Sequence, residues 1–162
     1  MRHLGGIDTV FVRAKTPTMH LHVCGVLLLD TSTMRGGDGR ARIGDLVAER
    51  LPLLAPFRWR LVETPGGVGG PRWIEDPEFD LDRHIHLATL PPPGSQADLE
   101  RYVAVVAGTP LERDRPLWEM HLVDGLDDGR TALVTKLHHA FMDGGAGAEI
   151  MASLFDLAPE VD

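Results

Sequence analysis

The chain has 162 residues, of which 43% are hydrophobic and 25% charged, and these fractions are typical of a globular domain. Its formal net charge of −8 argues against nucleic acid as the main partner, because neutralising phosphates requires clustered Lys and Arg. The single cysteine, Cys24, excludes an internal disulfide bond and a metal cage built from thiolates. We therefore expect one globular domain without a disulfide framework.

The sequence carries no membrane-targeting segment that we recognise. The first residues lack the apolar core of a signal peptide, and no run approaches the ~20 apolar residues of a membrane span. We therefore expect a cytoplasmic protein that is soluble by itself. A local basic or apolar patch could still contact a membrane surface despite the negative net charge.

The first half of the chain predicts two strands with a helix between them. Residues 21–29 are apolar on both alternating faces, which is typical of a strand covered on both sides. Apolar side chains then recur at helical spacing over residues 43–51, and Pro52 ends that helix. Residues 57–63 are predicted to form the second strand, which runs into a glycine-rich hairpin or loop at 65–71.

The segment before the next helix is irregular, and four of its side chains are predicted to be buried: Phe79, Leu81, Ile85 and Leu87. Ser95 can cap a helix that ends at Thr109-Pro110. Its apolar stripe is formed by Leu99, Tyr102, Val103 and Val106.

Two further strands, at residues 117–123 and 131–137, are joined by the turn residues 124–130, which favours an antiparallel pair. The second strand is apolar on both faces and is therefore predicted to be central. A helix with an apolar stripe over 150–155 follows. This alternation predicts an α/β fold (an α+β two-layer sandwich) with a mixed, largely antiparallel sheet flanked by helices.

The run His-His-Ala-Phe-Met-Asp-Gly, residues 138–144, lies where the predicted central strand gives way to a loop. A histidine held at a strand end can face a cavity, and its ordinary pKa of ~6.5 leaves a proton-accepting ring near neutral pH. Gly144 and Gly145 would let a ligand approach the backbone. Asp143 could form a salt bridge, orient an imidazole or cap the following helix, and the residues alone leave these roles open.

His-His-x-x-x-Asp-Gly resembles the signature of the acyltransferase superfamily that includes chloramphenicol acetyltransferase, carnitine acyltransferases and condensation domains. Within it, the chain is most similar to the bacterial wax ester synthase/diacylglycerol acyltransferase family. The similarity covers nearly all residues, and the supporting segments are 8–11, 19–23, 56–60, 73–74, 79–85 and 110–119, the last with Pro116-Leu117-Trp118 as a second hallmark.

The resemblance implies a chloramphenicol acetyltransferase-like fold and a role for each motif residue. His139 would be the general base that takes the hydroxyl proton of an alcohol or diacylglycerol as it attacks an acyl-CoA thioester, without an acyl-enzyme. Asp143 would hold the motif loop by pairing with an arginine. Gly144 would keep the path to the base open, and His138 would shape the loop with a minor part in catalysis.

The resemblance also implies that Pro116, Leu117 and Trp118 support the site and its substrate tunnel without performing chemistry. Acyl-CoA would be a co-substrate, and no cofactor or metal is expected. The product would be a triacylglycerol or a wax ester. The enzyme would act in the cytoplasm, with peripheral contact to the membrane or to lipid droplets.

One departure from the family concerns length, because its members have two related domains with the acyl tunnel between them. Residues 1–155 would form the N-terminal acyltransferase domain, and 156–162, which are acidic and contain proline, would begin a linker. The absent C-terminal domain, in the same or a separate chain, would be a partner. We expect little turnover from the N-terminal domain alone.

Two other functions remain open at this point. One is a condensation-type acyltransferase that takes its acyl group from a carrier protein, although Pro116-Leu117-Trp118 favours the lipid branch. The other is a non-catalytic binding module that keeps the fold, and the retention of His139, Asp143 and Gly144 counts against it.

The remaining histidines form two i,i+2 pairs, His20 with His22 and His84 with His86, and each pair is predicted to share a strand face. A zinc site needs three or four convergent ligands, so we expect these histidines to be structural or exposed to solvent. Cys24, within an apolar strand, is predicted to be a small buried residue and not a nucleophile.

Overall fold

The computed structural model describes residues 2–3, 20–32, 39–51, 54–63 and 70–141. Its centre is a four-stranded sheet with the strand order β2-β7-β6-β5. The strands are β2 (His22–Leu29), β5 (Ile85–Thr89), β6 (Trp118–Asp124) and β7 (Thr131–His138). β7 is antiparallel to β2 and β6, whereas β5 runs parallel to β6, so the predicted mixed, largely antiparallel sheet is confirmed.

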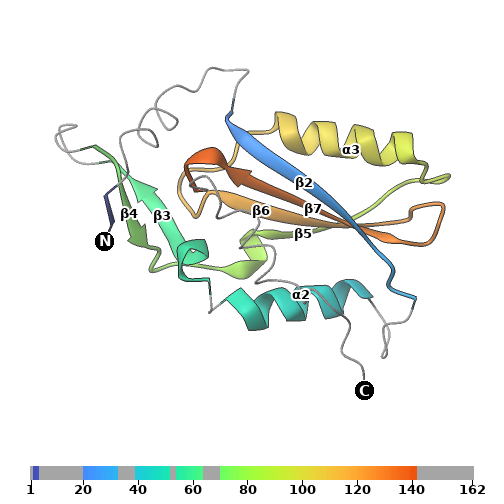
Figure 1. Ribbon diagram of the computed structural model, residues 1–162, viewed down its shortest axis with the longest axis horizontal. Helices are drawn as coiled ribbons and strands as arrows, with labels where there is room; N and C mark the ends of the chain where they lie inside the picture. Colours follow the sequence, from blue (N-terminus) through green and yellow to red (C-terminus); the bar gives the residue numbers. More distant parts are fainter. Residues whose placement is uncertain (1, 4–19, 33–38, 52–53, 64–69, 142–162) are drawn as a thin grey trace.

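One helix covers each face of this sheet, as Figure 1 shows, with α2 (Gly39–Arg50) on one side and α3 (Gln96–Gly108) on the other. The α2 side is one apolar core. Its buried members are Ile43, Val47, Leu51, Phe57, Trp118, Met120, Leu122, Leu133 and Leu137. The α3 side has a second core, formed by Leu90, Leu99, Val106, Val123, Ala132 and Val134.

α3 begins as the sequence predicts, with Ser95 as its N-cap. The Ser95 side chain accepts from the backbone N–H of Asp98, and the Asp98 carboxylate accepts from the backbone N–H of Ser95 at 2.8 Å. This capping box satisfies two backbone donors that the first turn leaves unpaired. The preceding Gly94 has φ 72°, and a Cβ there would lie 1.7 Å from the Gly125 carbonyl oxygen, so only glycine fits this approach.

A second, three-stranded sheet lies beside the first, with the order β1 (Arg2–His3), β4 (Arg72–Glu75) and β3 (Trp59–Val62). A third apolar cluster joins it to the main sheet. Its buried members are Leu61, Trp73, Leu111, Leu117 and Ala140. Because Leu117 precedes β6 and Ala140 follows β7, the small sheet packs against the end of the main sheet where the histidine motif lies.

Three expectations differ from the structure. Residues 57–58 belong to a 3-10 turn, η2 (Ala55–Arg58), so the strand begins at Trp59. The segment predicted to be irregular contains β5 and most of β4, and Leu87 on β5 is 61% exposed, not buried. β2 is an edge strand in the described sheet, and Val26 and Leu28 on it are 44% and 42% exposed, so it is less covered than predicted.

Candidate active site

The two motif histidines lie at the junction that the sequence predicts. His138 is the last residue of β7, and His139 begins a short 3-10 turn, η5 (His139–Phe141). His138 is buried with 3% exposure, whereas His139 is exposed. Asp143, Gly144 and Gly145 lie outside the described residues, as do the predicted helix at 150–155 and the linker at 156–162.

Backbone hydrogen bonds to the residues just before β6 and just before β2 hold this junction. The His138 N–H donates to the Leu117 carbonyl at 3.0 Å, and the His139 N–H donates to the Leu21 carbonyl at 2.8 Å. Leu21 has φ 54°, a left-handed conformation that side-chain-bearing residues rarely adopt and that costs about 1–3 kcal/mol. The backbone position of His139 therefore depends on a strained residue just before β2.

The ring of His138 is turned back towards its own loop. Its Nδ1 accepts a hydrogen bond from the Ala140 backbone N–H at 3.1 Å. An accepting Nδ1 has no proton, so the neutral ring carries its proton on Nε2. The buried Ala140 side chain is part of the cluster with Leu117 and Trp73. These contacts fix the orientation of the His138 ring at the start of the turn that follows β7.

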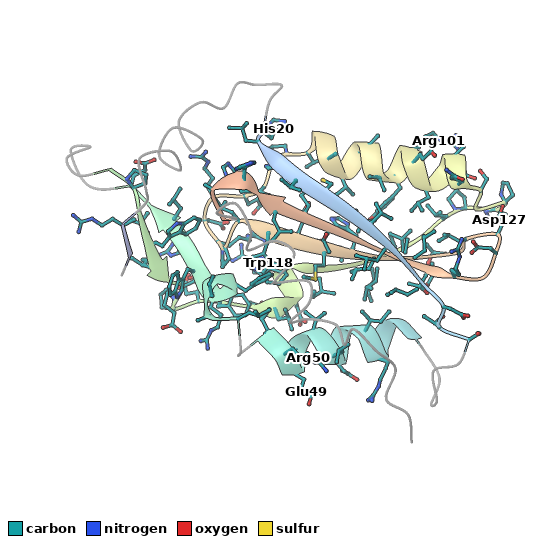
Figure 2. All side chains as sticks on the ribbon, viewed as in Figure 1. His20, Glu49, Arg50, Arg101, Trp118 and Asp127 are labelled. Carbon is teal, nitrogen blue, oxygen red and sulfur yellow. The ribbon has the colours of Figure 1, made fainter. Side chains whose placement is uncertain are left out.

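Pro116, Leu117 and Trp118 are all buried, and Leu117 contacts the histidine motif directly. Leu117 supplies the carbonyl that binds His138, as described above. The Trp118 Nε1–H donates to the Phe57 carbonyl at 2.8 Å, and the Trp118 carbonyl oxygen lies 2.8 Å from Nδ1 of His84, an atom that can bond to it only as a donor. Figure 2 labels Trp118 on the α2 side of the main sheet, where its ring stacks on His84 with centroids 4.3 Å apart.

His22 lies directly opposite His138 in the antiparallel register of β2 and β7, and their rings meet edge to face at 5.9 Å. The spacing of His22 in the sequence does not place it near the motif. Burial, and then the positive charge of Lys136, lower the pKa of His22 from 6.5 to about 4. The ring of His22 is therefore neutral at physiological pH.

A buried ion pair follows His138 along the same face of the sheet. The Lys136 side chain is fully buried, and its Nζ donates to Glu119 Oε1 at 2.8 Å and also to the Thr109 carbonyl at the C-terminal end of α3. Burial by itself would raise the pKa of Glu119, but the neighbouring His121 and the Lys136 ammonium lower it to about 2. The signal in the sequence was a lysine inside a strand predicted to be central, since a buried charge requires a partner.

The ionisable residues continue to β5. Glu119 and His121 lie on one face of β6, and His86 on β5 is the register partner of His121. Tyr102 on α3 covers His121, with its hydroxyl 2.9 Å from Nδ1. Burial, and then the neighbouring His121, lower the pKa of His86. We refer to His86, Glu119 and His121 as the His-Glu-His cluster.

The predicted histidine pairs need one correction. His84 precedes β5 with a helical backbone (φ −119°, ψ −20°), so the alternation of a strand does not apply to it. Its ring contacts Trp118 and Phe79 on the α2 side, whereas His86 lies on the α3 side against His121. His20 and His22 do lie together, with ring centroids 5.5 Å apart.

Cys24 is half-buried, and burial raises the pKa of its thiol, which disfavours a nucleophilic thiolate.

A largely apolar groove of about 570 Å³ lies between β2 and α3, on the α3 face of the main sheet. Its apolar lining is formed by Val26, Leu28, Leu99, Val103, Ala104 and Ala107.

Of the helices in the described part of the chain, neither α2 nor α3 is long and apolar enough to cross a membrane.

Solved structures with the same fold include a member of one acyltransferase family and a condensation domain. A wax ester synthase/diacylglycerol acyltransferase from Marinobacter aquaeolei VT8 is 32% identical with a TM-score of 0.81, over 94% of this chain and 36% of that one. The starter condensation domain of rhizomide synthetase has a TM-score of 0.70, also over 94% of this chain and 34% of its own. At 14% identity, this second similarity shows the fold alone.

Among curated proteins, the chain is 39% identical over 160 residues to a Mycobacterium tuberculosis protein provisionally named a diacylglycerol O-acyltransferase. That alignment covers 99% of this chain and 34% of the relative, so the chain spans about a third of the length of the relatives it matches. The model of the wax ester synthase/diacylglycerol acyltransferase catalytic domain matches residues 4–162. The chain belongs to the wax ester synthase/diacylglycerol acyltransferase family.

Proposed function

We propose that this chain carries the general base of an O-acyltransferase that moves a fatty acyl group from acyl-CoA to diacylglycerol or a long-chain alcohol. The observation that carries the proposal is the exposed His139, held by its backbone at the end of a buried strand, in a chain of this family. The name of the Marinobacter protein points to the same two acceptors.

In the proposed reaction, His139 accepts the hydroxyl proton while the alcohol oxygen attacks the thioester carbonyl. The carbon–sulfur bond then breaks, and the leaving CoA thiolate takes up the proton from His139. The products are an ester and CoA, and no acyl-enzyme forms. A histidine suits this role because its ordinary pKa leaves a neutral ring that can both accept and return a proton near pH 7.

The complete site needs more than the described residues. We expect Asp143 to hold the motif loop and Gly144 to keep the approach to His139 open. Because the relatives are about three times as long, we also propose that a further domain, in the same or a separate chain, completes the acyl tunnel. The enzyme would work in the cytoplasm, with contact to a membrane or lipid-droplet surface that delivers its lipid acceptor.

The test is ester formation by the full-length protein, supplied with acyl-CoA and either diacylglycerol or a long-chain alcohol. His139→Ala should lower kcat by about 10²–10⁴-fold, the usual contribution of a general base. Val105→Ala, at an exposed residue of α3, is the control and should keep most of the activity. Unchanged ester synthesis by His139→Ala would instead favour a non-catalytic module.

A second arm of the same experiment separates the acyl donors. We expect acyl-CoA to be used in preference to the same acyl group on a carrier protein. Exclusive use of the carrier-bound donor would reassign the chain to condensation-type chemistry while leaving the role of His139 intact.

A further inference from the structure

We propose that the His-Glu-His cluster is a binding site for a divalent transition-metal ion, with zinc as its natural occupant. The donor atoms of His86, Glu119 and His121 all lie within 4.8 Å of one another. His121 Nε2 is 3.3 Å from Glu119 Oε1, and His86 Nε2 is 3.9 Å from Glu119 Oε2. Zinc bonds of ~2.0–2.2 Å at tetrahedral angles place ligand atoms roughly 3.4 Å apart, so small side-chain rotations would close the site.

The surroundings of His121 prepare one of its nitrogens for a ligand. The Tyr102 hydroxyl lies 2.9 Å from Nδ1, while Nε2 is buried and makes no hydrogen bond of good geometry with the described residues. When Nδ1–H donates to the Tyr102 oxygen, the lone pair of Nε2 points into the cluster. Metal-binding histidines commonly use their second nitrogen in this way, because the outer hydrogen bond fixes the tautomer and the ring orientation.

The neighbouring Lys136 changes the charge of the site without blocking it. Its ammonium binds Oε1 of Glu119 at 2.8 Å, which leaves Oε2 on the side of His86. Counted together with the Lys136 ammonium, the carboxylate and the two neutral imidazoles carry no net charge, as three neutral imidazoles do. Three-histidine sites of this charge hold catalytic zinc in other proteins. The Thr109 carbonyl at the negative end of α3 also binds Lys136 and offsets part of the positive charge.

The site is closed on one side and open on the other. The side chains of Glu119 and His121 are 19% and 12% exposed, whereas His86 is 41% exposed. A bound ion would therefore keep a fourth position for water on the side of His86. It would also tie the edge strand β5 to β6 through side chains. The proposal does not depend on acyl transfer, since none of the three ligands belongs to the histidine motif.

The experiment titrates the full-length protein, prepared without a histidine tag and stripped with chelator, with Zn²⁺ by calorimetry and Co²⁺ by visible absorption. His86→Ala removes the exposed ligand. His121→Asn removes Nε2 but keeps an amide near the position of Nδ1 that can still bond to Tyr102. His20→Ala, at a histidine outside the cluster, is the matched control, and circular dichroism checks the fold of each variant.

We expect one equivalent of metal with the Co²⁺ spectrum of a four-coordinate nitrogen and oxygen site. Each ligand variant should weaken binding by at least about tenfold, and His20→Ala should leave it unchanged. If His121→Asn fails to fold, His86→Ala decides by itself, because its exposed ring is not needed for packing. The absence of saturable binding at one equivalent, or binding that survives His86→Ala unchanged, would overturn the proposal.

Discussion

On the α2 side of the main sheet, the side chains of β6 and β7 are apolar over most of their length and join one continuous core. On the α3 side, the same two strands carry apolar residues at one end, such as Val123 and Ala132, and ionisable residues at the other, from His138 to Glu119. Strand alternation separates these two environments by one residue. Apolar packing on the α2 face therefore holds the strands in place. On the α3 face, the part next to the motif is lined by charged and polar side chains.

The largest effect should come from Trp118 on the α2 face. Trp118→Ala should lower the free energy of unfolding by about 3–5 kcal/mol, because it opens a cavity in the core and removes the hydrogen bond to the Phe57 carbonyl. Chemical denaturation measures this loss. Val105→Ala, at an apolar residue that is 68% exposed on α3, should change the free energy by less than about 0.5 kcal/mol. A loss below 1 kcal/mol for Trp118→Ala would contradict the continuous core.

The next largest effect should come from the Lys136–Glu119 ion pair on the α3 face, where a second substitution should restore stability. Glu119→Met leaves the Lys136 ammonium buried without its carboxylate and should cost about 3 kcal/mol. In the double variant with Lys136→Met, most of this loss should return, because two apolar side chains replace the pair. Denaturation of the single and double variants gives the coupling energy. Additive losses would mean that the pair is not the unit that stabilises this face.

A smaller effect should appear as a pH dependence of stability that comes from His22. With a pKa of about 4 in the folded protein and 6.5 in the unfolded chain, His22 binds protons only in the unfolded chain between these values. Stability should therefore fall as the pH drops from 6.5 to 4. Because the residue is only partly buried, we expect its share to be about 1–2 kcal/mol.

His22→Asn tests this share by comparing the free energy of unfolding at pH 7 and at pH 4.5. The variant should lose about 1–2 kcal/mol less than the wild type over this interval. Equal losses in both proteins would show that the neighbours of His22 do not hold its ring neutral.

The smallest effect on stability should come from the capping box at the N-terminus of α3. Ser95→Ala removes the hydroxyl of the capping box and should cost about 1 kcal/mol. Gln96→Ala, at the next residue and exposed, should cost less than half of that. If the two variants were equal, the capping box would not stabilise the start of α3.

The elements that local signals determine were predictable from the sequence. The helix stripes, the Ser95 cap and the turn between β6 and β7 gave α2, α3 and the antiparallel hairpin with nearly correct ends. β5 was not predicted, because its five residues are stabilised by parallel pairing with β6, a strand distant in sequence. Local alternation cannot reveal such pairing, and Leu87 was assigned to the core for the same reason.

The residues of the candidate site were likewise predictable from the sequence only in part. His138 and His139 follow directly from the motif at the strand end, and the structure places both at that end. The proximity of His22, the Lys136–Glu119 pair and the His-Glu-His cluster depends on strand register, which no short sequence pattern shows. His84 was paired with His86 by spacing alone, and the helical backbone of His84 separates them.

The hydrogen bond from the Ala140 amide to the ring of His138 has a consequence for observing the motif without substrate. Protonation of Nδ1 would replace the acceptor with a donor and break the bond. The Ala140 amide proton would then lose its protection from exchange with solvent, while the ¹⁵N resonances of the ring would report the change of protonation state. His138 and Ala140 thus form a built-in spectroscopic reporter of the motif loop, which can be monitored in the ligand-free protein.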